Sequence, residues 1–246
     1  MELDNAVVLI TGANRGLGRA FTTALLDAGA AKVYAGARDP QSVDASDPRV
    51  VPLRLDITRP EDVAAAAGIA ADVTLLVNNA GIATGTHALG DDGLEGARQE
   101  MEVNYFGHLA VSRAFAPVLA ANGGGALVNV LSALSWVSFP QYGNYSAAKS
   151  AAWSLTNHLR TVLRGQGTLV SGLHLGYADT DMTAGVDAPK AAPADIAAAL
   201  VAGLRVGEEE ILADETSRFV KAALSGPVDA LYADVQAGYD GALARR

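Results

Sequence analysis

The sequence predicts an α/β fold, in which one domain is built on a doubly wound parallel sheet. Short apolar runs alternate with longer segments of helical periodicity over most of the chain. Such apolar runs are typical of buried strands, and buried strands joined by helices imply right-handed βαβ units. The chain has 246 residues, is 50% hydrophobic and shows no shift in composition. We therefore expect a single Rossmann-like domain over residues 1–246.

Six apolar runs are predicted to be strands, and a shorter run at residues 210–213 is a candidate seventh. The six runs cover residues 6–11, 31–36, 50–55, 73–77, 126–131 and 168–175. Five helices are predicted in the same part of the chain, over residues 16–28, 60–68, 95–121, 144–163 and 193–204. The Asn-Gly-Gly-Gly sequence at residues 122–125 is typical of a turn between a helix and a strand.

Residues 214–246 are predicted to form a helical C-terminal extension of this domain. Two helices are expected, over residues 214–224 and 228–244, with a Ser-Gly-Pro break between them. Apolar residues of the second helix recur at helical spacing, which indicates a face that packs against the body. They are Leu231, Tyr232, Val235 and Tyr239. A cover over a substrate cleft, or a contact between subunits, is the alternative role of this face.

Composition excludes several classes of function. The formal net charge is −9 and there is no basic patch, which argues against a nucleic-acid partner. Cysteine is absent, and no group of histidines and carboxylates has metal-ligand spacing, so no disulfide and no metal is expected. No apolar run is long enough to span a membrane, and the acidic N-terminus lacks the positive region of a signal peptide. A cytoplasmic protein that acts on a small molecule is the expectation.

Glycines at positions 12, 16 and 18 follow the first predicted strand and open the first predicted helix. Their spacing is G-x-x-x-G-x-G, which differs from the common dinucleotide fingerprint G-x-G-x-x-G. The physical requirement is the same, because the backbone must turn tightly and present a helix N-terminus to a pyrophosphate. Glycine is needed where a side chain would block that approach. The pattern predicts a dinucleotide site, with an ordinary glycine-rich turn as the alternative.

Tyr145 and Lys149 lie four residues apart in a predicted helix, so they share one face. A nearby ammonium favours the phenolate and lowers the pKa of a tyrosine from its usual value near 10. Such a phenol can act as an acid or base near neutral pH. Hydride attack on a ketone creates an alkoxide, and a hydroxyl pair that stabilises and protonates it lowers the barrier. Ser132, at the end of the fifth predicted strand, supplies a second hydroxyl.

In their order along the chain, these residues are joined by the Asn-Asn-Ala-Gly sequence at residues 78–81 and by Asn104. Together they resemble the short-chain dehydrogenase/reductase family, and the resemblance runs from about residue 7 to residue 182. It implies a nicotinamide-dependent oxidoreductase with four catalytic residues.

The resemblance also implies the role of each catalytic residue. Ser132 steadies the substrate carbonyl, and Tyr145 transfers the proton. Lys149 binds the nicotinamide ribose and lowers the pKa of Tyr145, and Asn104 holds a water molecule in a proton relay. Ser135 competes for the role of Ser132, but it lies beyond the end of the strand.

The cofactor site implied by the resemblance begins at the glycine turn. Asp56 matches the family residue that contacts adenine, and the loop at residues 78–81 lies along the cofactor. Gly176 and Thr180 match a turn beside the nicotinamide carboxamide, although Leu175 replaces the usual proline. The expected set is Gly12, Asn14, Arg15, Gly16, Leu17, Gly18, Arg38, Asp56, Ile57, Asn78, Ala80, Gly81, Tyr145, Lys149, Gly176, Thr180 and Met182.

Charge near the second strand predicts NADP(H) rather than NAD(H). An acid about 20 residues past the glycines would bind the ribose hydroxyls of NAD and repel a 2′-phosphate. Here the strand ends without an acid and Arg38 follows, while Arg15 lies in the glycine turn. Two guanidiniums suit a phosphate, because they bind it through paired hydrogen bonds. Asp39 opposes this preference, and two solvated surface arginines are the alternative.

The substrate pocket is expected beside the catalytic residues. The expected lining is mostly apolar with two phenols, which favours a hydrophobic or aryl ketone or its alcohol. It comprises Ala83, Ser132, Leu134, Tyr142 and Tyr177. Trp136 and Met182 are further candidates, with core packing as the alternative, and residues 183–192 correspond to the family's mobile lid.

Two other classes of function stay open. A non-catalytic dinucleotide sensor on the same fold is expected to lose the tyrosine or the lysine, and this chain keeps both. A family member that acts on another C=O or C=N substrate, or that carries out epimerisation or dehydration, is the second alternative. The resemblance also implies a homo-oligomer, a dimer or tetramer, formed through the helices at residues 95–121 and 144–163.

Overall fold

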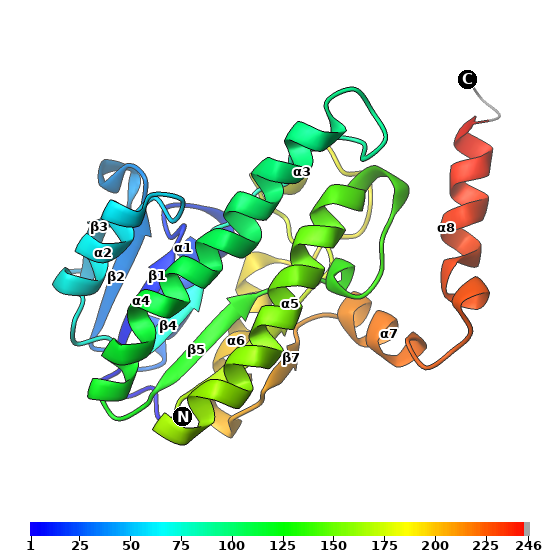
Figure 1. The fold of residues 1–246 in the computed structure, drawn as a ribbon. Helices are drawn as coiled ribbons and strands as arrows, with labels where there is room; N and C mark the ends of the chain where they lie inside the picture. The colour runs from blue at the N-terminus through cyan, green and yellow to red at the C-terminus, as the bar shows by residue number, and fades with distance from the viewer. Residues whose placement is uncertain (244–246) are drawn as a thin grey trace.

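Seven parallel strands form one sheet in the computed structural model, which describes residues 1–243 (Figure 1). Their order is β3-β2-β1-β4-β5-β6-β7. The strands are β1 (Val7–Thr11), β2 (Lys32–Ala37), β3 (Val50–Arg54), β4 (Leu75–Asn78), β5 (Ala126–Val130), β6 (Leu169–His174) and β7 (Glu210–Leu212). The chain builds outward from β1 to β3 and then returns to place β4 on the other side of β1. The strand order therefore reverses between β1 and β4, and ligands bind beyond the carboxyl ends of the strands at such a reversal in folds of this kind.

Helices cover both faces of the sheet, as the sequence predicts (Figure 1). One layer consists of α1 (Gly16–Asp27) and α6 (Pro193–Val206), which pack against each other. The other layer consists of α2 (Pro60–Ile69), α4 (His108–Ala121) and α5 (Gly143–Leu163).

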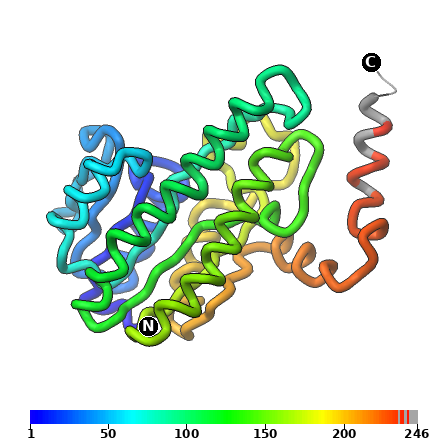
Figure 2. Tube along the Cα trace, viewed as in Figure 1, coloured from blue at the N-terminus to red at the C-terminus, as the bar shows by residue number. Residues whose placement is uncertain are grey.

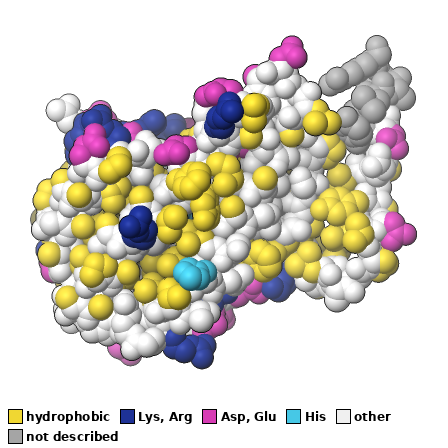
Figure 3. Space-filling model, viewed as in Figure 1, with side chains coloured by type: hydrophobic (Ala, Val, Ile, Leu, Met, Phe, Trp, Pro, Cys, Tyr) yellow, Lys and Arg dark blue, Asp and Glu magenta, His cyan; other side chains and the backbone are white. Residues whose placement is uncertain are grey.

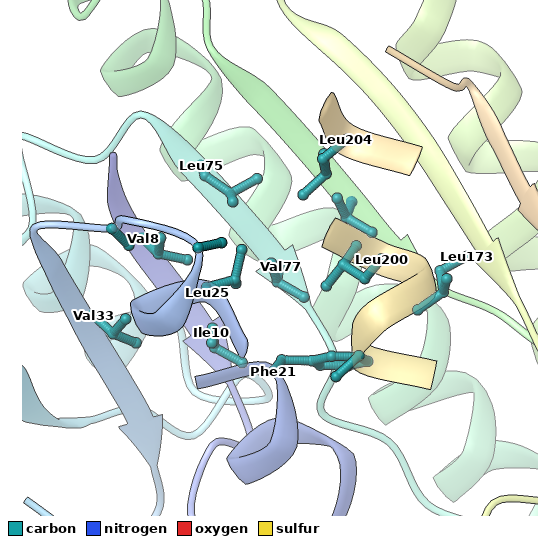
Figure 4. Close-up of a cluster of buried hydrophobic side chains, with 14 of the residues drawn as sticks. Val8, Ile10, Phe21, Leu25, Val33, Leu75, Val77, Leu173, Leu200 and Leu204 are labelled. Carbon is teal, nitrogen blue, oxygen red and sulfur yellow. The ribbon is translucent and has the colours of Figure 1, made fainter. Parts of the chain in front are cut away.

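Alternate residues of β1 enter different cores, because successive side chains of a strand point to opposite faces. Val8 and Ile10 pack with Phe21 and Leu200, from α1 and α6 (Figure 4). Leu9 faces the opposite core, among side chains of the α2, α4 and α5 layer. The central strand is therefore buried on both faces, which explains its unbroken apolar sequence.

The helix predicted over residues 95–121 is interrupted in the structure. It consists of α3 (Gly93–Met101), a π-helical turn η2 (Glu102–Gly107) and α4. The axis continues through the turn in Figure 1, so the interruption changes side-chain direction rather than the course of the chain. Gly107 lies against Ile57, whose Cδ1 would be 2.6 Å from a Cβ at that position.

Within residues 1–243, five short 3-10 helices lie in the loops. They are η1 (Pro40–Ser42), η3 (Ala133–Ser135), η4 (Pro140–Tyr142), η5 (Arg164–Gln166) and η6 (Asp181–Thr183). No helix in the described part of the chain combines the length and apolar character needed to cross a bilayer.

The C-terminal extension forms α7 (Glu215–Ala223) and α8 (Val228–Leu243), close to the predicted bounds. Figure 2 shows the chain leaving the sheet after β7, passing through α7 and running along α8 at the edge of the molecule. Leu231 and Tyr232 pack against the loop that follows β5, and the Tyr232 hydroxyl accepts a hydrogen bond from Ser138 N at 3.1 Å. The first turns of α8 therefore present the predicted face to the body. Ala244 and the side chain of Tyr239 lie outside the described residues.

Candidate active site

The four predicted catalytic residues come from three separate segments and meet at the carboxyl edge of the sheet. Ser132 follows β5, Tyr145 and Lys149 lie near the start of α5, and Asn104 lies in the π turn. Gly81 lies beside two of them, because a Cβ there would be 2.9 Å from Asn104 Oδ1 and 3.7 Å from Lys149 Nζ. Lys149 Nζ lies 5.7 Å from the centroid of the Tyr145 ring.

The π turn directs Asn104 into the interior. Its side chain is fully buried, and both ends of the amide bind the same residue of the loop after β4. Oδ1 accepts from Ile82 N at 3.0 Å, and Nδ2 donates to Ile82 O at 2.9 Å. Because π-helical turns often occur at functional sites, the position of Asn104 within one agrees with a role in the site.

Lys149 is a buried cation, with 4% of its surface exposed. Its ammonium donates to Val130 O at 2.9 Å. Burial lowers the pKa of Lys149 to about 8, because the neutral amine is less costly to desolvate. The charge of this group therefore changes within the working range of a typical enzyme.

The pKa of Tyr145 differs from the prediction made from its spacing to Lys149. Burial raises the pKa of this phenol, a hydrogen-bonding interaction with Ser132 opposes that rise, and the charge of Glu100 adds to it. The ammonium of Lys149 faces the ring and donates to a carbonyl of β5, rather than binding the phenol oxygen. In this arrangement Tyr145 is held as a protonated acid.

Ser132 begins the short helix η3 and is held by several neighbours. Its Oγ accepts from Leu134 N at 3.1 Å, and its backbone N–H donates to Ser135 Oγ at 3.2 Å. Ser135 thus supports Ser132 instead of replacing it. Behind them, His174 Nδ1 lies 3.2 Å from Ser132 O, and its ring stacks on Trp136 at 3.8 Å between centroids.

His174 and His108 are both fully buried, and burial lowers the pKa of each to about 3. Each ring has one nitrogen with a hydrogen-bond partner. His108 Nε2 lies 2.8 Å from Ala80 O, and His174 Nδ1 is the nitrogen that lies near Ser132 O. Both are neutral residues packed in the interior. Trp136, stacked on His174, belongs to this packing rather than to an open pocket.

The glycine turn has the close packing that the sequence predicts. Gly12 and Gly16 have φ values of +65° and +52°, a region that favours glycine. A Cβ on Gly18 would lie 2.1 Å from Gly12 O, so a side chain there would break the turn. No side chain caps α1 in the described structure, and its first N–H groups are left for an anion, as a bound pyrophosphate requires.

Asn79 holds this turn in place, although the sequence analysis selects its neighbours. Its Nδ2 donates to Thr11 O at 2.9 Å and to Gly12 O at 3.1 Å. Asn78 points into the core, where its amide donates to Ser112 Oγ at 3.0 Å and to Asn129 Oδ1 at 2.9 Å. The alternation of side chains at a strand end is the signal that separates the two asparagines.

The segment after β6 lies across the glycine turn. A Cβ on Gly16 would be 3.3 Å from Thr180 Cγ2, and Arg15 Nη1 is 3.3 Å from Asp181 Oδ2. Arg15 and Asp181 are exposed, so this ion pair contributes little stability. Met182 is also exposed, at 52%.

Arg38 is exposed beyond the end of β2. Burial raises the pKa of Asp56, but hydrogen bonds from Thr58 and the charge of Arg38 outweigh burial and lower that pKa below its ordinary value. Asp56 Oδ1 accepts from Thr58 N at 3.0 Å and from Thr58 Oγ1 at 2.7 Å. Asp39 caps the short helix η1, since its Oδ1 accepts from Gln41 N at 3.0 Å. The Asp39 carboxylate, whose charge opposes those of the two arginines, is thus hydrogen-bonded within its own loop.

The predicted pocket residues lie in different environments. Leu134 packs with Trp136, Tyr142 and Tyr145, whereas Ala83 is exposed in the loop after β4. The rings of Tyr142 and Tyr177 lie 6.2 Å apart between centroids. Burial raises the pKa of the Tyr177 phenol, with a further contribution from Tyr142. No group of three potential metal ligands occurs among the described residues.

Comparison with known proteins gives a consistent result. A family model described as short chain dehydrogenase matches residues 6–191. The 1-deoxy-11-beta-hydroxypentalenate dehydrogenase of Streptomyces exfoliatus is 34% identical over 218 residues, which cover 83% of this chain and 79% of that protein.

Two solved structures share the fold. A short chain dehydrogenase from Burkholderia cenocepacia J2315, in complex with NADP, is 41% identical with a TM-score of 0.91, over 96% of this chain and 99% of that one. A short chain dehydrogenase/reductase from Burkholderia phymatum, in complex with NAD, is 25% identical with a TM-score of 0.79, over 100% of this chain and 97% of that one.

Proposed function

The chain belongs to the short-chain dehydrogenase/reductase family and is an oxidoreductase, and we propose that it is an NADPH-dependent carbonyl reductase that also works as a secondary-alcohol dehydrogenase. The observation that carries the proposal is the approach of Asn104 and Lys149 beside Gly81, with the Lys149 ammonium facing the Tyr145 ring and Ser132 in a hydrogen-bonding interaction with the Tyr145 phenol. The bound nicotinamide supplies or accepts the hydride.

Side chains of the protein transfer the proton and stabilise the negative charge that develops on the substrate oxygen. Ser132 donates a hydrogen bond to the substrate oxygen, and Tyr145 protonates that oxygen during reduction. A phenol whose pKa is raised by burial stays protonated and is ready to act as this acid. Lys149 supplies positive charge beside the ring and binds the nicotinamide ribose. Asn104 fixes the loop after β4 and holds a water molecule for the proton relay.

We propose a hydrophobic or aryl ketone, or the corresponding alcohol, as the substrate. Leu134, Tyr142 and Tyr177 give this side of the site an apolar surface with two hydroxyls. The Streptomyces exfoliatus relative is named as the dehydrogenase of a hydroxylated compound, which supports an alcohol as one form of the substrate.

The proposal includes a homo-oligomer formed through the outer face of the α4 and α5 layer. Phe106, in the π turn that leads into α4, is 49% exposed, and Val162 in α5 is 51% exposed. Figure 3 shows hydrophobic side chains over the helices of this layer.

The function is tested by following oxidation of NADPH and NADH with a panel of ketones, aldehydes and imines. We expect turnover with hydrophobic ketones, and faster turnover with NADPH than with NADH. Tight dinucleotide binding without turnover of any compound in the panel would favour a non-catalytic dinucleotide sensor. Activity with imines alone would favour a family member that acts on C=N substrates.

Arg38→Ala is expected to weaken the use of NADPH and leave that of NADH nearly unchanged, because only NADPH has the 2′-phosphate. A charge-assisted contact contributes roughly 1.5–3 kcal/mol, or about 10- to 150-fold in kcat/KM. Added salt should erode the preference, since the arginine is exposed. Arg205→Ala removes an exposed arginine from the last turn of α6, outside the proposed subunit interface, and serves as the control. A wild type that prefers NADH would overturn the assignment of NADPH as the cofactor. An unchanged preference in Arg38→Ala would indicate that Arg15, and not Arg38, binds the 2′-phosphate.

A further inference from the structure

Glu100 is a buried carboxylate in the last turns of α3, with 1% of its surface exposed. Its Oε1 accepts from Thr84 N at 2.6 Å and from Thr84 Oγ1 at 2.9 Å. Its Oε2 is buried without a hydrogen-bond partner, and no ion pair forms to this side chain among the described residues. A buried, unpaired carboxylate is costly, so its presence beside the site requires a reason.

Hydrogen bonds lead from Glu100 to the start of the catalytic helix. Thr84 Oγ1 lies 2.8 Å from Thr86 Oγ1, which accepts from Asn144 Nδ2 at 3.1 Å. Asn144 Nδ2 also donates to Gly93 O at 2.8 Å. Asn144 directly precedes Tyr145, so the chain of contacts ends in the first turn of α5, at the residue before Tyr145.

The packing around this chain leaves little freedom. A Cβ on Gly96 would lie 1.9 Å from Thr86 Oγ1, so α3 approaches the loop as closely as a backbone can. One turn beyond Glu100, Asn104 binds both backbone groups of Ile82 in the same loop. Glu100 of α3 and Asn104 of η2 therefore both hold the loop that follows β4.

Charged and titratable groups from several elements act on Tyr145. Lys149 in α5 faces its ring, and Ser132 at the end of β5 has a hydrogen-bonding interaction with its phenol. Glu100 in α3 and Tyr177 after β6 interact with it electrostatically. His108, whose pKa burial lowers to about 3, is neutral near Lys149. Glu100 and Lys149 are thus the opposing charges at this site, and the carboxylate adds to the rise in the pKa of Tyr145.

We propose that Glu100 is a positioning residue of the reaction: through Thr84, Thr86 and Asn144 it fixes the first turn of α5, and its negative charge opposes that of Lys149 at the Tyr145 phenol. The inference rests on the proposed function, because it assumes that Tyr145 transfers the proton. In this arrangement the carboxylate keeps the phenol protonated for reduction, and the hydrogen bonds keep it pointed at the substrate.

The test compares Glu100→Gln with Glu102→Gln, which removes an exposed carboxylate two residues away. Both variants are assayed for alcohol oxidation as a function of pH, and NADP binding and thermal melting confirm that each is folded. Loss of a negative charge makes the phenolate easier to form, so the rise of kcat with pH should move to lower pH in Glu100→Gln. Glu102→Gln should keep the wild-type profile.

Thr84→Val tests the hydrogen bonds separately, because it removes the hydroxyl but leaves the carboxylate. We expect a lower kcat with an unchanged position of the pH profile. Full activity of Thr84→Val would overturn the positioning role, even if Glu100→Gln did not fold. A folded Glu100→Gln with the wild-type pH profile would overturn the role of the charge. The Tyr145→Phe variant separates a failure of the Glu100 proposal from a failure of the proposed function. Substantial turnover without the phenol would overturn the proposed function itself.

Discussion

Replacing Tyr145 with phenylalanine is expected to remove most turnover and to leave NADPH binding nearly intact. The phenol oxygen is lost, while the ring that packs with Leu134 and Val137 stays. General acid catalysis of this kind contributes about 10²–10⁴-fold in rate. The measurement is steady-state reduction of an active ketone, with NADPH affinity followed by fluorescence.

Tyr142→Phe is the matched control, since it removes a second phenol oxygen from the same cluster. It should alter KM more than kcat, because Tyr142 is proposed to contact the substrate rather than to transfer a proton. Near-normal turnover by Tyr145→Phe would remove Tyr145 from the mechanism. Equal losses in both variants would show that the cluster needs its hydroxyls for packing rather than for chemistry.

The sheet and its helical layers could be predicted because burial on both faces leaves a plain apolar signal. The predicted strands run one or two residues past the observed strands, as at Leu55, Val73 and Leu131, although Leu55 N and Leu131 N still donate to carbonyls of the neighbouring strand. These residues are buried outside the strands, at 3%, 0% and 1% exposure. Hydrophobicity reports burial and not backbone pairing, so strand ends are the part it cannot place.

The π turn could not be predicted for a related reason. A π-helical turn keeps the helical course and only widens it, so the apolar pattern continues from α3 into α4. The sequence therefore predicts one helix, and the burial of Asn104 appears only in the structure.

The candidate site was predicted where residue type and spacing carry the chemistry, and missed where only geometry does. The glycine turn and the Tyr145–Lys149 pair have recognisable spacings. Glu100 and Asn79 have none, because their partners, Thr84 and Gly12, are brought to them by the fold. The pKa of Tyr145 also depends on burial, which no spacing between two side chains reveals.

Lys149→Met should lower kcat by roughly 10²–10³-fold, the cost of removing one preorganised electrostatic contact. Methionine keeps most of the buried stem but loses the ammonium and its hydrogen bond to Val130 O. Burial and Glu100, which both raise the pKa of Tyr145, would then act without the opposing charge. Alcohol oxidation should therefore need a higher pH, and NADPH affinity should fall because Lys149 is proposed to bind the ribose. An unchanged pH profile and affinity would make Lys149 a packing residue only.

Loss of the Lys149 proton should itself make activity depend on pH, and the Lys149→Arg variant can separate this effect from the titration of other groups. Since burial lowers the pKa of Lys149 to about 8, the free enzyme loses the ammonium as pH rises through that value. The kcat/KM for ketone reduction, which reports on the free enzyme, should fall above about pH 8. A guanidinium stays charged throughout this range, so the fall should disappear in Lys149→Arg. A fall that persists in Lys149→Arg would assign the titration to another group, because the variant has no amine at this position to lose its proton.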